Sequence, residues 1–125
     1  MTTSSDTYAT ALALKWERYG SQSLTDSEHL YLHVTSVVAF MSGAKTFEEF
    51  FEIGFKAEDI AACLRDIGHP RSAATVLIAH RIYRRSSSDA ALVILARAFC
   101  AMEADMMKCL ARFKSTHCRG DESED

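Results

Sequence analysis

The sequence predicts an all-α fold: a single-domain bundle of five or six helices with a long helix at its C-terminal end. Three observations support this fold class. Apolar residues recur at spacings of three and four in every clear segment, and no segment alternates over the length of a strand. Glycines and capping residues mark the boundaries between these segments. The chain of 125 residues contains one proline and five glycines, which leaves little room for long irregular connections.

The first two predicted helices are delimited by residues typical of helix ends. The first spans residues 7–19, with apolar side chains spaced by four, and ends before Gly20. The second begins at a capping box, the reciprocal pair of hydrogen bonds that Thr25 and Glu28 can form, and closes at Gly43. We therefore expect two helices joined by a short turn.

Three further helices are predicted over residues 47–53, 57–67 and 70–85. Thr46 and Glu49 form a second capping box in front of the first of them. A glycine separates the other two. The single proline stands at the first position of the last helix, where its missing N–H group has no intrahelical partner to lose.

A long helical pattern covers residues 90–114 and would span about 35 to 40 Å as one helix. Residues 92–96 are apolar on every side, and a helix of that kind is buried on every side. Two arrangements satisfy this requirement: the helix lies at the centre of the bundle, or it completes its burial in a homodimer. Residues 1–116 are expected to form the helical domain, and residues 117–125 an acidic disordered tail.

Residues 40–55 concentrate five of the seven phenylalanines and three glutamates in one short segment. Phe40 precedes the turn between two predicted helices, so its ring can meet the rings of the following helix across the corner. On that short helix the phenylalanines share one face and the glutamates occupy the other. A buried aromatic plug with an acidic outer rim is the favoured interpretation, and a partly exposed docking patch is the alternative.

Charge is segregated along the chain, although the formal net charge is only −3. Residues 1–69 carry a net charge of −5, residues 70–119 of +6 and residues 120–125 of −4. Exposed charges act over about 8 to 10 Å at physiological salt, so this dipole can steer a charged partner. The net charge does not favour a dedicated nucleic-acid binder.

No residue pattern indicates catalysis, a cofactor or a metal site, and the chain is predicted not to be an enzyme. His29 and His33 have the four-residue spacing of metal ligands on a helix, but no third ligand accompanies them. His80 projects among apolar positions, where a neutral, hydrogen-bonded core histidine is expected. His117 and Cys118 lack the second pair that a four-ligand site needs.

The sequence favours a cytoplasmic protein. No stretch has the roughly eighteen apolar residues that cross a bilayer, so no membrane association is expected. The first ten residues lack the basic start and apolar block of a secretory signal. The four cysteines show no paired spacing, which favours free thiols in a reducing compartment.

An alternative function rests on the basic residues of the segment 70–85. Together with the preceding helix, this segment can be interpreted as a helix-turn-helix whose second helix enters the major groove of DNA. Its exposed positions are largely alanine, valine, leucine and isoleucine rather than base-contacting side chains, and direct nucleic-acid binding is therefore the less favoured reading. The candidate nucleic-acid-binding residues are Arg71, Arg81, Arg84 and Arg85.

Two stretches, "LTDSEHLYLHVTSVVAFMSGAKTFEEFF" and "AACLRDIGHPRSAATVLIAH", resemble a known family. They make residues 24–83 similar to the small helical bacterial DNA-mimic proteins of the DMP-nineteen type. Ser42, Gly43 and Ala44 stand where that family has an asparagine and paired glycines. The resemblance implies a protein without catalytic activity, whose carboxylates imitate DNA phosphates and occupy the basic face of a DNA-binding protein.

The favoured function is a protein-binding regulator or inhibitor, similar to a DNA mimic or an immunity protein. Its partner would be a basic protein such as a DNA-binding protein, a nuclease or a toxin. A fixed row of carboxylates attracts a partner's lysine and arginine side chains and speeds association. The expected partner-binding residues are Glu48, Glu49, Glu52, Glu58, Asp59 and Phe50.

Overall fold

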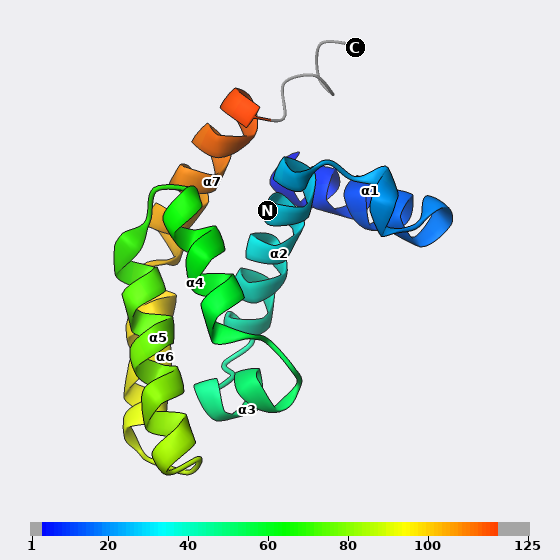
Figure 1. Cartoon of the computed structure of the whole chain (residues 1–125). Coiled ribbons are helices and arrows are strands. Elements are labelled where there is room, and N and C mark those ends of the chain that lie inside the picture. The colour runs from blue at the N-terminus through cyan, green and yellow to red at the C-terminus, as the bar shows by residue number, and fades with distance from the viewer. Residues whose placement is uncertain (1–3, 118–125) are drawn as a thin grey trace.

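The computed structural model describes residues 4–117, and this part of the chain is helical without any strand (Figure 1). The predicted all-α fold class is confirmed. The elements in chain order are α1 (Ser4–Tyr19), the 3₁₀ helix η1 (Ser21–Ser23), α2 (Asp26–Met41), α3 (Phe47–Glu52), α4 (Ala57–Asp66), α5 (Pro70–Arg85), α6 (Ala91–Ala101) and α7 (Glu103–His117). The predicted acidic tail, apart from His117, lies outside the described residues.

Both predicted capping boxes are present. At the start of α2, the Thr25 N–H group donates to the Glu28 carboxylate at 2.8 Å, and the Glu28 N–H group donates to the Thr25 hydroxyl at 3.1 Å. At the start of α3, the same pair of bonds joins Thr46 and Glu49, at 2.9 and 3.2 Å. Each box satisfies two N–H groups that a helix start leaves without partners, so both helices begin where the sequence predicts.

The second helix was predicted to close at Gly43, and α2 ends at Met41, just before it. In the turn to α3 the residue with a positive φ is Ala44, at 62°. Alanine tolerates this region poorly because its Cβ approaches the backbone carbonyl. The turn therefore holds a strained residue one position beyond the glycine.

The segment predicted as one long helix is divided into α6 and α7. The break lies at Met102, whose φ of −94° and ψ of 3° leave the helical region and whose N–H group bonds to the Phe99 carbonyl at 3.0 Å. The two halves differ in their main neighbours: α6 lies against α5, α3 and α2, and α7 lies against α2. Acidic Glu103 and Asp105 favour a new helix start just after the break.

The apolar stretch 92–96 is not buried on every side within the chain. Leu92 and Ala96 are buried, but Val93 is 39% exposed and Ile94 is 65% exposed. The expectation of complete burial at the centre of the bundle is therefore wrong. The outward face of α6 remains an apolar surface that the described residues do not cover.

The aromatic segment forms the predicted plug at the corner between α2 and α3. Phe47 and Phe50 are fully buried, and their rings meet edge to face at 5.4 Å. Phe40 reaches across the corner to Phe50 at 6.3 Å and to Phe55 at 5.7 Å. Phe47 also contacts Phe99 of α6 at 5.7 Å, so the plug ties the short helix α3 to the rest of the core.

The helices α4 and α5 form a hairpin that supports this corner. Figure 1 shows α4 between α5 and α2, with α3 below it and α1 running off to one side. Gly68 turns the chain with a φ of +91°, and Pro70 occupies the first turn of α5, as the sequence predicts. Within residues 4–117, no helix has the length and apolar character needed to span a bilayer.

Candidate functional site: an acidic ridge and a basic cleft

The three glutamates of α3 form one edge of the short helix, which we call the acidic ridge (Glu48, Glu49 and Glu52). Glu49 and Glu52 are exposed, and Glu48 is half-buried. Phe47 and Phe50 anchor the opposite face of the helix in the core, so the ridge has a fixed orientation. Glu49 is held further by its capping bonds to Thr46. The ridge thus presents ordered carboxylates to solvent.

Phe50 does not belong to any contact surface of the folded chain. It was predicted among the partner-binding residues, but its side chain is 0% exposed and its ring stacks on Phe55 at 4.4 Å. Burial of a phenylalanine in the core stabilises the fold by about 2 kcal/mol, which outweighs any gain from exposing it. Phe50 therefore supports the ridge from behind.

An exposed isoleucine follows the ridge directly. Ile53 closes α3 and is 61% exposed, although it is a large apolar residue. Protein interfaces typically have an apolar centre surrounded by a polar and charged rim. The sequence prediction did not include this residue, because its exposure depends on how α3 is oriented against α5 and α6.

The predicted row of five carboxylates is divided between two elements. Glu58 and Asp59 are exposed in the first turn of α4, beyond the connection that contains the exposed Lys56. Glu58 faces a cleft lined by arginines, so it belongs to a different surface from the ridge. No carboxylate of either group forms an ion pair with another residue between positions 4 and 117.

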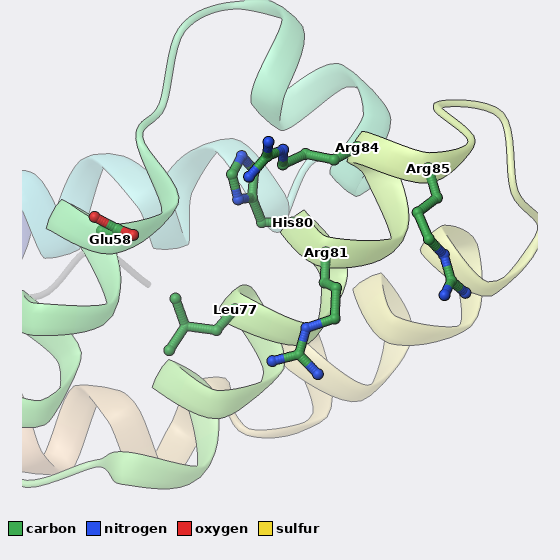
Figure 2. Close-up of a pocket in the computed structure, with 6 residues that line it drawn as sticks. All are labelled: Glu58, Leu77, His80, Arg81, Arg84 and Arg85. Carbon is green, nitrogen blue, oxygen red and sulfur yellow. The ribbon is translucent and has the colours of Figure 1, made fainter.

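The C-terminal half of α5 lines an open cleft of about 470 Å³, which we call the basic cleft (Figure 2). Figure 2 shows the α5 side chains on one wall and Glu58, from the first turn of α4, across from them. Arg85 extends from the far end of α5, away from Glu58. The lining residues are Glu58, Leu77, His80, Arg81, Arg84 and Arg85.

Aromatic contacts position the cleft relative to the ridge. The ring of Phe51 lies 5.1 Å from the His80 ring and 5.1 Å from the Tyr83 ring, which joins α3 to α5. His80 is half-buried, and its ring nitrogens have no hydrogen-bond partner in the described chain. The predicted hydrogen-bonded core histidine is therefore an aromatic contact at the edge of the cleft instead.

The four predicted nucleic-acid-binding arginines do not form one cluster. Arg81, Arg84 and Arg85 line the cleft, whereas Arg71 lies in the first turn of α5. A separation of thirteen residues corresponds to about 20 Å along a helix, so Arg71 and Arg84 are at opposite ends. None of these four guanidinium groups has an ion-pair or hydrogen-bond partner among the residues described.

The histidines of α2 have structural surroundings. The His29 ring nitrogen Nε2 hydrogen-bonds the Ser21 carbonyl at 2.7 Å, and its ring lies 5.0 Å from Trp16. His33 is exposed. His117 stacks on Phe113 at 4.3 Å, and Cys118 lies outside the described residues. In the range 4–117, no three histidine, cysteine or acidic side chains are grouped as metal ligands would be.

Sequence reasoning missed a buried histidine–serine pair at the start of α5. His69 Nδ1 lies 2.8 Å from the Ser72 hydroxyl and accepts the Ser72 N–H group at 3.2 Å. The distances would suit a nucleophile and its base, but both residues are buried and Ser72 also bonds the His69 carbonyl at 3.0 Å. The pair caps the helix, and the sequence "HPRS" with its helix-starting proline was the available signal.

Two cysteines are poorly suited to nucleophilic chemistry. Burial raises the pKa of the Cys63 thiol, and the nearby carboxylates of Asp66 and Asp59 raise it further. Burial and the carboxylate of Glu103 likewise raise the pKa of the Cys100 thiol. Because the thiolate is the reactive form, both side chains stay protonated and inert near neutral pH.

Comparisons of the chain with protein-family models, with curated proteins and with solved structures gave no match.

Proposed function

We propose that this protein is a non-enzymatic regulator or inhibitor that binds a basic protein through the acidic ridge. The observation that carries the proposal is a row of carboxylates on a short helix whose opposite face is locked in the core. Within residues 4–117 these carboxylates have no ion-pair partner, so their charge is available to a partner protein. The proposal agrees with the DNA-mimic resemblance of residues 24–83.

Fixed carboxylates favour binding for two physical reasons. Their field attracts lysine and arginine side chains before contact, which raises the association rate at low salt. Because Phe47 and Phe50 hold the helix and Thr46 holds Glu49, little conformational entropy is lost when the partner binds. Exposed Ile53 adds apolar area that can be buried beside the charges.

The test compares two charge-matched double variants. Glu49→Gln/Glu52→Gln removes two ridge charges and keeps the cap, because glutamine can form the same capping bond. Glu17→Gln/Asp105→Asn removes two exposed charges from α1 and α7. Tagged proteins are used to recover partners from source-cell lysate at low salt, with elution by a salt gradient, and the association rate of the purified partner is then measured.

The ridge variant should lower the association rate about tenfold at low salt and much less at high salt, while the control variant changes it little. Equal effects of the two variants would contradict a specific ridge interaction. Recovery of nuclease-sensitive DNA in place of a basic protein would favour the alternative function instead.

That second candidate function is DNA binding by α4 and α5 as a helix-turn-helix. The observation in its favour is that Arg71, Arg81, Arg84 and Arg85 are all exposed and without partners in the described chain. The exposed stripe between the two ends of α5 contains Ala74 and Ile78, which cannot donate hydrogen bonds to base edges. DNA binding is therefore the second candidate function, after the binding of a basic protein.

The proposal includes a homodimer formed through α6. The exposed side chains of Val93 and Ile94 are adjacent on the first turns of this helix, where a second copy of the chain could cover them. We also place the protein in the cytoplasm, where thiols such as those of Cys63 and Cys100 remain reduced.

A further inference from the structure

The residues that line the basic cleft carry more positive than negative charge, with three arginines against the single carboxylate of Glu58. Arg81 and Arg84 line it from the last turns of α5, and Arg85 lies at its far end and extends away from Glu58 (Figure 2). None of the three is paired with a carboxylate within the described part of the chain, although Glu58 lines the same cleft. Guanidinium groups bind phosphate oxygens in a two-pronged geometry, so an anion entering the cleft would find several donors.

His80 adds a donor with a fixed position. Its ring lies 5.1 Å from Phe51, at an interplanar angle of 61°, and this contact restrains the imidazole at the edge of the cleft. Its ring nitrogens have no hydrogen-bond partner within residues 4–117, so an imidazole N–H group can donate to a ligand oxygen. The proposed anion site therefore combines a restrained donor, His80, with the longer and more flexible arginine side chains.

Glu58 determines which kind of anion fits. Its carboxylate lies on the α4 side of the cleft, across from the α5 side chains (Figure 2). A carboxylate only accepts hydrogen bonds, so the part of the ligand near it must carry hydroxyl or amine groups. A continuous phosphate backbone would be repelled there, and the next exposed arginine of α5, Arg71, lies about 15 Å from Arg81 along the helix axis.

The size of the cleft agrees with a small ligand. Its volume of about 470 Å³ lies within the range of about 300 to 1,000 Å³ that is usual for small-molecule sites. Leu77 supplies an apolar wall between the charged ends. The two guanidinium groups of Arg81 and Arg84 also match the double charge of a phosphate monoester better than the single charge of a carboxylate.

We propose that the basic cleft binds a small phosphorylated molecule. Its phosphate monoester is bound by Arg81, Arg84 and His80, and its hydroxyl- or amine-bearing end lies against Glu58. This site is separate from the acidic ridge, and the ligand proposal does not depend on whether the protein binds a basic partner through that ridge.

The test is a titration of the full chain, followed by amide chemical shifts and by calorimetry at constant ionic strength. The probes are ribose 5-phosphate, ribose, inorganic phosphate and a short duplex DNA. Ribose 5-phosphate should shift the amides of residues 77–85 and of the first turn of α4 in a saturable manner. Ribose, which lacks the phosphate, should not.

Matched variants separate the site from general charge attraction. Arg81→Gln/Arg84→Gln should weaken ribose 5-phosphate binding about tenfold or more, whereas Arg71→Gln should change it less than about twofold. Glu58→Gln should weaken the binding of ribose 5-phosphate, because the sugar hydroxyls lose the carboxylate that accepts their hydrogen bonds. It should not weaken the binding of inorganic phosphate, which has no sugar hydroxyls. Arg84→Lys keeps the charge but loses the two-pronged geometry, so it should weaken ribose 5-phosphate binding by an intermediate factor. This single variant keeps the test valid if the double variant does not fold.

Three results would overturn the proposal. The first is the absence of saturable shifts with ribose 5-phosphate up to about 10 mM, a concentration far above typical cofactor affinities. The second is an equal loss of binding in Arg71→Gln and in the cleft variants. The third is tighter binding of duplex DNA, dependent on Arg71, which would assign the arginines to a nucleic-acid backbone.

Discussion

At the scale of single residues, Glu28 shows how one side chain can hold two elements. It is only 2% exposed, caps α2 through Thr25, and lies 3.7 Å from the Lys15 ammonium of α1. Glu28→Ala should lower the free energy of unfolding by about 2 kcal/mol, because it removes the cap and leaves the Thr25 N–H group without its partner. Urea unfolding followed by circular dichroism measures this change.

Two further substitutions distinguish the cap from the ion pair. Glu28→Gln keeps the capping bond and should lose less than half as much stability as Glu28→Ala. Lys15→Met should lose less than about 1 kcal/mol, since the lysine side chain is 41% exposed and its charge is screened by solvent. A larger loss in Lys15→Met than in Glu28→Ala would show that the ion pair, not the cap, holds this corner.

At the scale of elements, the turns between helices differ in how much strain they carry. Gly68 has a φ of +91° with open space around its missing Cβ, so Gly68→Ala should lower the free energy of unfolding by about 1 kcal/mol through backbone strain alone. Ala44 already has a φ of 62°, so Ala44→Gly should raise it by about 0.5 kcal/mol. Thermal and urea unfolding of each variant measures both effects.

Gly43 provides the matched control for these turns. It has no positive φ, and an added Cβ would meet the Phe40 carbonyl oxygen at an ordinary 3.5 Å. Gly43→Ala should therefore change the free energy of unfolding by less than about 0.5 kcal/mol. Any change should be a small increase, because alanine reduces the conformational entropy of the unfolded chain. A loss in Gly43→Ala as large as that in Gly68→Ala would contradict the assignment of the left-handed residue to Ala44.

At the scale of the whole molecule, the exposed apolar face of α6 predicts self-association. If a second copy covers this face, sedimentation equilibrium should show a dimer, and Ile94→Glu should raise its dissociation constant about tenfold or more. Ile53→Glu is the control, because Ile53 is the same residue type and similarly exposed but lies at the C-terminal end of α3. A wild-type monomer, or equal effects of the two substitutions, would exclude α6 as the interface.

The sequence alone determined the helices, their capping boxes and the aromatic corner. The helices and their caps depend on residues within about four positions of one another, where helical periodicity and hydrogen-bonding preferences act directly, and the corner joins two consecutive helices across a short turn. Thr25 with Glu28 and Thr46 with Glu49 therefore appear as predicted. The burial of Phe47 followed in the same way from the separation of phenylalanines and glutamates on opposite faces of one short helix.

Only the tertiary structure determined where the predicted long helix divides into α6 and α7 and which charged residues line the same cleft. The apolar pattern runs unbroken through Met102, yet the helix breaks there, with α6 packed mainly on α5 and α7 mainly on α2. Likewise, Glu58 lines one cleft with Arg81 and Arg84, more than twenty positions away along the chain, while Arg71 of the same helix is left out. Such placements depend on how helices pack against one another, which no local spacing encodes.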